Sequence, residues 1–534
     1  MNQKKGQFAR ESTGLTREFG AFDSFILAVC ATVGLGIHTL SVMAIKSYPG
    51  ASLPLAYAIM AIPAIAVTAT VWLLIGTMPR TGGIYVFVSR LIHPSLGYWI
   101  GWLYYFPYAF VIGAIAYYSV YILGSSFTVM GYVLDSQAII SLGTTLSTDE
   151  AGILGGFILM VLSFLVVYFG LGVYKQTQRF LYGISIVATI FTIFFLWGYS
   201  SPGGFSSMWN SVFGAGAYQE IVDVAVANGW TSNVTTFSWD ATTQAFTPAI
   251  FGATSMIALG SLIGGEIKSV KKTSFYMTVG AAIFIFVFYI IYSAGIINLV
   301  SYDFISQYHY AVAHAGELSI NPALGPSIPL FAAVSAAGVS PILVGLVGIG
   351  GALWLINDIP PMVYASVRIP FALSFDRMAP DKLNAISRFG SPKWALLMTF
   401  VPGIITLLAS SPKLGVGGII ISSVYVLFEW MVYPLVGMAA ILLPLKKDLF
   451  ERGPAFRVAG IPLIQICGAV TVVSGFFLMY KNGQTLLGGT YGDLLGIIGT
   501  VCIGFFFLLY AYYYAKNKNK GIDPELIYSE IPPE

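Results

Sequence analysis

The stretch DSFILAVCATVGLGIHTLSVMA, residues 23–44, is long and apolar enough to cross a lipid bilayer. Two glycines at its centre, Gly34 and Gly36, each weaken a helix by about 1 kcal/mol relative to alanine. In hydrocarbon, freed backbone groups are tolerated only where protein or a water-filled cavity satisfies them. We therefore predict a broken helix whose free backbone groups and half-helix dipoles form a site for a zwitterion or an ion. The alternative is a glycine pair that only lets neighbouring helices pack closely.

The composition of the chain is typical of a polytopic membrane protein. Hydrophobic residues make up 57% of the 534 residues and charged residues only 9%, whereas about 25% charged is usual in soluble domains. The N-terminus is polar and basic and leads directly into the first span, so we expect no cleavable signal. Cys30, Cys467 and Cys502 lie in apolar runs, which indicates neither a disulfide framework nor a metal cluster.

Windows of about 20 apolar residues predict twelve membrane-spanning helices. They begin near Ala21, Leu53, Leu96, Ile153, Phe180, Phe251, Phe275, Pro341, Trp394, Val416, Ile461 and Leu494. With the N-terminus inside, all of the 26 Lys and Arg residues except Lys46, Lys413 and Lys481 fall in cytoplasmic segments. We therefore expect a multi-pass protein of the cell membrane with both termini in the cytoplasm.

Two connecting segments carry predictions of their own. The outer loop, residues 201–247, is rich in Ser, Thr, Gly, Asn and Trp, and we expect it to form a partly ordered cap. It contains the sequon Asn233-Val234-Thr235, and whether Asn233 is glycosylated stays open. After the second span, PRTGGIY at residues 79–85 runs into an apolar stretch that ends at Leu91. This turn signal predicts an interfacial or re-entrant helix.

Span six repeats the glycine pattern of span one. It reads PAIFGATSMIALGSLIGGEIKSVKK, with Gly260, Gly264 and Gly265 in mid-course and Glu266 at or just below the expected break. Corresponding interruptions five spans apart point to an inverted-repeat transporter with its site at the interface of the repeats.

Span eight places Asn357 and Asp358 directly before Pro360 and Pro361. An intramembrane carboxylate costs about 3 kcal/mol, so it should face the bundle interior and suggests an ion or proton site. The alternative is a structural partner for backbone groups that the prolines free. Glu429 in span ten is a weaker candidate because no glycine break accompanies it.

Four motifs occur in the order expected of one family. They are Val33-Gly34-Leu35-Gly36-Ile37, the PRTGGIY loop, Gly264-Gly265-Glu266, and Arg368 followed by DRMAP at residues 376–380. These resemble the G-x-G-I, P-R-x-G-G-x-Y, G-x-E and R...A-x-D-G-x-x-P segments of the amino acid-polyamine-organocation (APC) transporters. The resemblance covers about residues 19–392.

The resemblance implies an all-α polytopic membrane protein of the LeuT-type 5+5 inverted-repeat fold, with broken helices 1 and 6. Its implied parts are a cytoplasmic N-terminal segment (1–20), a first repeat (21–200), an extracellular loop (201–247), a second repeat (248–444), two peripheral helices (445–515) and a cytoplasmic tail (516–534).

The resemblance also implies where an amino acid or related amine would bind. The substrate carboxylate would meet backbone N–H groups beside Gly34, and the ammonium would meet carbonyls of both broken helices. The implied substrate-binding residues are Thr32, Gly34, Leu35, Gly36, Ile37, Gly260, Ser261 and Ile263. Gly260 stands where many members carry an aromatic gate, so the pocket is either wider or closed from span three by Trp102 or Phe106.

Asp358, Asn357 and Glu266 are the candidates for ion or proton coupling. Residues 357 and 358 stand where relatives often have hydroxyl residues near a sodium or proton site, and burial disfavours the charged form of a carboxyl group. We favour a proton at Asp358 because the usual hydroxyl pair is missing. Glu266 is the rival carrier, and its alternative role is to hold local helix ends together.

The expected function is secondary active transport of amino acids or related amines by alternating access, coupled to protons and without a cofactor or a resident metal. The alternative is a sodium-coupled symporter or an exchanger of another small solute, such as a nucleobase or a polyamine. An enzyme, a channel or an ATP-driven pump is disfavoured, since the sequence lacks paired catalytic groups, a filter sequence and a nucleotide-binding glycine loop. We expect no nucleic-acid partner, and the oligomeric state stays open.

Overall fold

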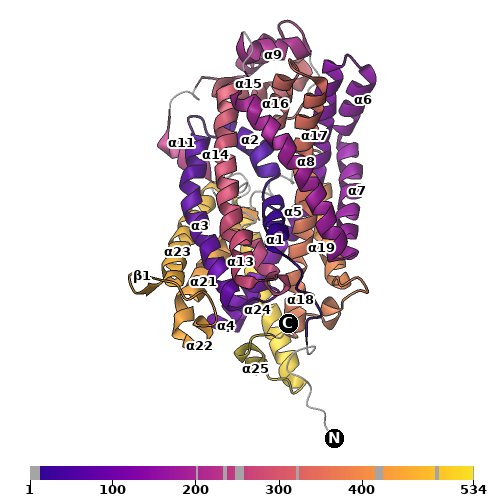
Figure 1. Cartoon of the computed structure of the whole chain (residues 1–534). Helices are drawn as coiled ribbons and strands as arrows, with labels where there is room; N and C mark the ends of the chain where they lie inside the picture. The colour runs from indigo at the N-terminus through magenta and orange to yellow at the C-terminus, as the bar shows by residue number, and fades with distance from the viewer. Residues whose placement is uncertain are drawn as a thin grey trace.

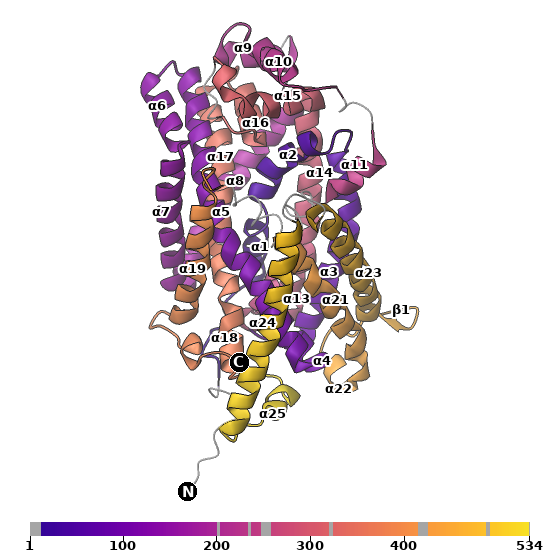
Figure 2. The ribbon, with the colours of Figure 1, turned by 180° about the vertical axis from the view of Figure 1, so that it is seen from behind.

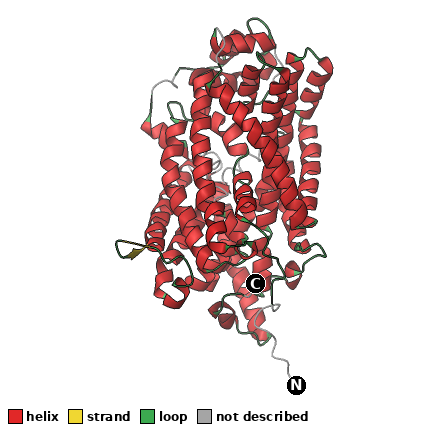
Figure 3. Ribbon diagram, in the orientation of Figure 1, coloured by secondary structure: helices red, strands yellow, loops and turns green. Residues whose placement is uncertain are grey.

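The computed structural model describes residues 12–199, 203–232, 237–246, 258–319, 324–414, 425–487 and 492–532. These residues form an elongated bundle of long helices, and helix dominates the picture coloured by secondary structure (Figures 1 and 3). Helices this long and apolar satisfy their own backbone hydrogen bonds, which is what a membrane-spanning segment requires.

Within the described residues, eight helical segments are long and apolar enough to cross a membrane. The helices that form them are α3 (Leu53–Thr77), α5 (Pro94–Val133), α7 (Asp149–Tyr168), α8 (Leu171–Trp197), α13 (Val270–Phe275) with η4 (Tyr276–Gly280) and α14 (Ala281–Val300), α17 (Pro341–Ser366) with α18 (Arg368–Phe375), α21 (Tyr425–Leu442) with η8 (Leu443–Leu445), and α23 (Leu463–Leu487). The prediction of a polytopic all-α membrane protein is confirmed at this level.

The four remaining predicted spans coincide with elements that are not among these eight: three are short or broken, and the fourth, α24, is a continuous helix of 28 residues. These are α1 (Ala21–Cys30), the π-helix η1 (Gly36–Leu40) and α2 (Ser41–Ser47) for span one, η2 (Leu259–Leu262) and η3 (Gly264–Glu266) for span six, α19 (Lys393–Ala409) and α24 (Gly492–Asn519). The predicted starts of spans six and ten, Phe251 and Val416, lie outside the described residues.

One end of the bundle carries a layer of short helices that covers the ends of the long ones (Figure 1). The layer consists of α6 (Gln137–Leu146), α9 (Gly204–Phe213), α10 (Ala217–Ala227), α11 (Trp239–Gln244), α15 (Tyr302–Ala313), η5 (Ala315–Glu317) and α16 (Ile328–Ala336). The buried ring of Trp209 in α9 packs against Phe304 of α15 and Phe331 of α16. The loop predicted as a cap therefore contains helices α9 to α11, and Asn233 lies outside the described residues.

Both termini lie at the opposite end, which we call the terminal end (Figures 1 and 2). Its elements are α4 (Gly83–Leu91), η6 (Asp381–Asn384), α22 (Lys447–Phe450), the antiparallel strands β1 (Arg457–Val458) and β2 (Ile461–Pro462), and α25 (Pro524–Ser529). The helix predicted after the PRTGG turn is present as α4, and Gly82 precedes it in the left-handed region at φ 82°. That backbone conformation favours glycine.

The fifth span differs from its prediction. Helix α8 begins at Leu171, after Gly170 at φ 96°, and not near Phe180. Lys175 and Arg179 therefore lie on the helix and not in a loop before it. Their positions are explained by ion pairs to the segment around α1, since Lys175 reaches Glu18 at 3.6 Å and Arg179 reaches Asp23 at 2.6 Å.

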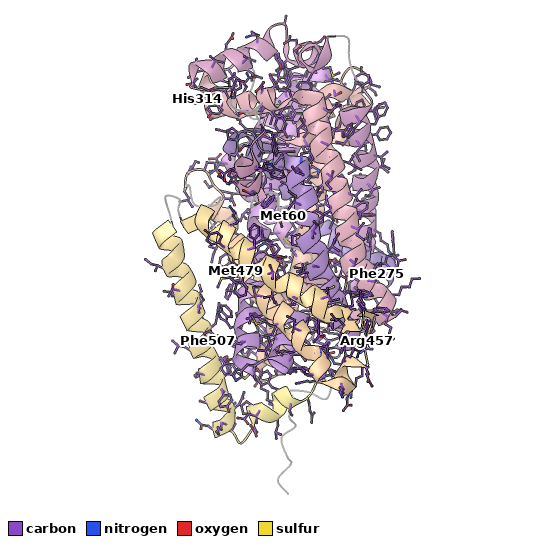
Figure 4. All side chains as sticks on the ribbon, turned by 90° about the vertical axis from the view of Figure 1, so that its left-hand side faces the viewer. Met60, Phe275, His314, Arg457, Met479 and Phe507 are labelled. Carbon is purple, nitrogen blue, oxygen red and sulfur yellow. The ribbon has the colours of Figure 1, made fainter. Side chains whose placement is uncertain are left out.

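Helix α5 is 40 residues long and extends past the length that a bilayer needs. Helix α6 folds back against its far end, where a Cβ on Gly124 would lie 2.8 Å from the Gly143 carbonyl oxygen and a Cβ on Gly143 would lie 2.7 Å from that of Gly124. Small residues of this kind let two helix backbones approach closely. On another side, α23 with Met479 and α24 with Phe507 flank the bundle (Figure 4).

Candidate functional site

The first helix is broken inside the bundle, as its glycine pair predicts. Helix α1 ends at Cys30, residues 31–34 are not helical, and η1 begins at Gly36 before α2 continues the direction. The last hydrogen bond of the first half runs from Val33 N to Val29 O at 2.8 Å. Leu35, Gly36 and Ile37 lie at the start of the second half, where the first N–H groups of any helix have no acceptor within the helix.

Polar side chains contact several carbonyls at the break, some from the same span and one from a neighbouring helix. The Tyr289 hydroxyl of α14 donates to Thr32 O at 2.9 Å, and His38 Nδ1 contacts Gly34 O at 2.9 Å. Ser41 Oγ donates to Gly36 O at 3.2 Å and lies 2.5 Å from the hydroxyl of Tyr57 in α3. Polar side chains from the second half of the span itself, together with tyrosines of α3 and α14, therefore surround the break.

Asp358 of α17 lies directly against this break. A Cβ placed on Gly34 would lie 2.5 Å from Asp358 Oδ2, and the acid is only 3% exposed. Among the described residues, Oδ1 of Asp358 has no hydrogen-bond partner. A buried carboxyl oxygen of this kind is costly unless a proton, an ion or a water molecule completes its contacts.

Asn357 contacts the same break from the neighbouring position on α17. Its Nδ2 lies 2.9 Å from Cys30 Sγ at the end of α1, and its backbone carbonyl accepts a 3.4 Å hydrogen bond from Gln178 of α8. Two of the three residues predicted for coupling, Asn357 and Asp358, are therefore adjacent to the point where the first helix is interrupted. The structure brings Asn357, Asp358, Thr32 and Gly34 together.

Glu266 lies elsewhere, in a closed ion pair near the terminal end. Arg368 donates from Nε to Glu266 Oε1 at 2.8 Å and from Nη2 to Oε2 at 2.9 Å, while the Tyr364 hydroxyl donates to Oε2 at 2.6 Å. The carbonyl of Glu266 also accepts the N–H groups of Glu18 and Phe19 at 2.9 and 3.0 Å. Glu266 thus connects the segment before α1 with the end of α17 and the start of α18.

The described part of the sixth predicted span contains the short 3-10 helices η2 and η3, and the PRTGG loop before α4 contacts it. Gly82 N donates to Leu262 O at 2.9 Å, and Thr81 forms an antiparallel bridge with Ile263. The predicted pocket residue Ser261 faces this contact, because its carbonyl would collide with a Cβ on Gly83. Ser261 and Ile263 therefore belong to the contact between η2 and the PRTGG loop.

Gly260 faces Met277 of η4, since a Cβ on Gly260 would lie 2.7 Å from Met277 Cγ. Trp102 and Phe106 pack against Phe506 of α24, with ring centroids 6.3 and 5.6 Å apart. In this conformation, the two rings predicted to close the pocket from span three contact the peripheral helix α24.

Some residues of the site carry no recognisable signal in the sequence. Tyr289 and Tyr57 are two of 32 tyrosines and stand in ordinary apolar spans. Tyr85 and Asp376 belong to two separate motifs, yet the Tyr85 hydroxyl donates to Asp376 Oδ2 at 2.5 Å and Arg90 pairs with the same oxygen at 2.7 Å. The spacing of residues within each motif does not indicate that the two motifs contact each other.

A family model described as Amino acid permease matches residues 23–520 of the chain. The matched range includes the break of the first helix, the 3-10 helices η2 and η3, and Asp358. No curated protein matches the chain.

Proposed function

The chain belongs to the amino acid permease family of the APC superfamily, and from this premise we propose that it is a proton-coupled secondary transporter of amino acids or related amines. The family supports the class of substrate, and the long apolar helices support a place in the membrane. We propose the LeuT-type arrangement of two five-helix inverted repeats, with alternating access to one central site. The terminal end would face the cytoplasm, and the membrane would be the cell membrane.

The observation that carries the coupling proposal is the contact of Asp358 with the break of the first helix. The substrate carboxylate would bind the free N–H groups at Leu35, Gly36 and Ile37, where the helix dipole favours an anion. A proton on Asp358 would neutralise the acid beside this site. Its release would leave a buried negative charge next to the bound carboxylate, which disfavours the loaded state and links the two events.

Two contacts support a proton over a sodium ion. The carbonyls of Thr32 and Gly34, which could otherwise serve as cation ligands, contact the Tyr289 hydroxyl and His38 Nδ1. A sodium ion would have to displace these groups, whereas a proton needs only one oxygen of Asp358. The bidentate Arg368 pair also supports a structural role for Glu266, because hydrogen bonds from Arg368 and Tyr364 already occupy both of its carboxylate oxygens.

The test is uptake by the purified protein in liposomes. Amino acids and related amines would be screened with a proton gradient and a sodium gradient imposed separately. We expect concentrative uptake of at least one amino acid with the proton gradient alone. Uptake that requires sodium, or uptake of only a nucleobase, would contradict the proposal.

A further inference from the structure

A pocket of about 810 Å³ opens at the terminal end between α4, α22 and the C-terminal tail that includes α25. These elements lie together at the lower end of the bundle in Figures 1 and 2. The pocket is lined by Arg80, Arg90, Leu445, Lys446, Lys447, Asp448, Leu449, Arg452, Tyr528, Ser529, Glu530 and Ile531. Its charged lining consists of five cations and two acids, so the pocket favours an anion.

One wall of the pocket is a buried and ordered cluster around Arg90, which is 6% exposed. Arg90 pairs with Asp376 at 2.7 Å, donates to the Glu530 carbonyl at 3.3 Å and lies over the ring of Tyr528 at 4.8 Å. Lys446 Nζ donates to the Arg90 carbonyl at 2.7 Å, which ties the segment before α22 to the same wall. These contacts hold the C-terminal tail and α4 against each other without a ligand.

The other wall carries exposed cations. Among the described residues, no ion pair joins Lys446, Lys447 or Arg452 to an acid. Lys446 uses one of its three donors on the Arg90 carbonyl, which leaves two for a ligand. Lys and Arg presented together in this way suit a phosphate group, which accepts several charge-assisted hydrogen bonds.

An exposed apolar side chain lines the pocket beside these cations, and two more follow α22 in the chain. Leu445 lines the pocket and is 75% exposed, and Phe456 and Val458 beyond α22 are 52% and 53% exposed. Apolar side chains next to cations are typical of a segment at the boundary between the bilayer and water. An anion in the pocket would therefore lie at the level of lipid headgroups.

We propose that this pocket binds a phosphate-bearing anion at the membrane surface, as presented by the headgroup of an anionic phospholipid. The anion would bridge the cations of α22 to the wall formed by Arg90 and the tail. Basic pockets on the cytoplasmic side of membrane proteins recognise such headgroups, so the assignment to a lipid rests on the proposed orientation of the chain. Binding itself does not depend on transport and is tested separately.

The test compares lipid binding to three purified proteins by native mass spectrometry. The proteins are the wild type, the triple variant Lys446→Gln, Lys447→Gln, Arg452→Gln, and a control with the same change of charge, Lys382→Gln, Arg388→Gln, Lys393→Gln. The control residues belong to the terminal end but do not line the pocket. We expect phosphatidylglycerol to bind the wild type more tightly than phosphatidylcholine. The pocket variant should lose this preference by about tenfold or more, and the control should keep it.

Competition with inorganic phosphate distinguishes a site for a phosphate group alone from a site for a whole lipid. Displacement of phosphatidylglycerol by millimolar phosphate supports a site for the phosphate group alone, and resistance to phosphate supports a site for the lipid. Equal loss of binding in the pocket variant and the control would overturn the proposal, since it would mean that general surface charge attracts the lipid. Equal binding of phosphatidylglycerol and phosphatidylcholine to the wild type would overturn it as well.

A second variant covers the case in which the triple variant does not fold. Glu530→Gln removes an acid from the lining and leaves its backbone carbonyl, which accepts from Arg90, in place. We expect phosphatidylglycerol to bind this variant about two- to fivefold more tightly. Unchanged or weaker binding, with an unchanged melting temperature in phosphatidylcholine, would contradict the proposal.

Discussion

The Cβ that Gly34 lacks would lie 2.5 Å from Oδ2 of Asp358, so the break of the first helix and the acid of α17 are in direct contact. The two residues come from different spans. Gly34 is a candidate for substrate binding because it lies in the glycine pair of span one, and Asp358 is a candidate for coupling because it is an intramembrane acid. Their contact places a titratable group beside the free backbone groups of the break. It also leaves no room for a side chain at residue 34.

Gly34→Ala should therefore lower transport by at least about tenfold, because the added methyl group displaces Asp358 or shifts the break by a fraction of an ångström. Gly20→Ala is the matched control, since nothing lies within 4 Å of a Cβ at that position just before α1. Initial rates of uptake in liposomes, normalised to inserted protein, measure both. Equal rates in the two variants would show that Asp358 is not constrained by residue 34.

Asp358→Asn should abolish uptake against a concentration gradient while counterflow of substrate persists. The amide keeps the shape of the side chain but cannot take up or release a proton. Counterflow persists because the exchange of substrate at equilibrium requires the binding site to change the side it faces, without net movement of protons. Asp240→Asn, at an exposed position of α11, serves as a control for loss of a carboxylate. The proposal fails if the Asp358 variant still concentrates substrate in response to an imposed pH gradient.

Glu266→Gln should destabilise the protein by about 3 to 5 kcal/mol, because it leaves Arg368 as an unpaired buried cation. The free energy of unfolding in mixed micelles measures the loss. The double variant Glu266→Gln, Arg368→Met should recover part of it, since both charges are then absent. If Glu266→Gln keeps wild-type stability and loses only the proton dependence of uptake, Glu266 is the coupling group.

Gly260→Trp should shift substrate preference toward small amino acids or stop transport, as predicted for a residue that sets the size of the pocket. The structure adds that a new side chain first meets Met277, whose Cγ would lie 2.7 Å from a Cβ at residue 260. Met277→Ala in the same protein should therefore restore folding without restoring large substrates. The substrate preference is measured by competition, with a panel of amino acids each tested as an inhibitor of uptake. An unchanged preference profile in a folded Gly260→Trp variant would count against a role for residue 260 in selectivity.

Sequence alone was sufficient for features that depend on the local chain. Apolar length predicted a polytopic helical membrane protein, and eight described segments are long and apolar enough to span a bilayer, which leaves few alternatives to a long helix. The glycines at positions 34 and 36 predicted the break of the first helix, and Gly82 preceded the predicted helix α4. The carboxylate of Asp358 was expected to face the bundle interior, because the membrane penalises any other position.

Tertiary structure decided which of these features contact one another. Glu266 pairs with Arg368, 102 residues away, and no local pattern distinguishes that partner from other cations. Trp102 and Phe106 pack against Phe506 of α24, because the neighbour that a side of a helix meets depends on how the whole bundle packs. Tyr289 reaches the Thr32 carbonyl across 257 residues. Local sequence determines where the backbone must break, whereas the partner that satisfies each freed or buried group is set by contacts between distant segments.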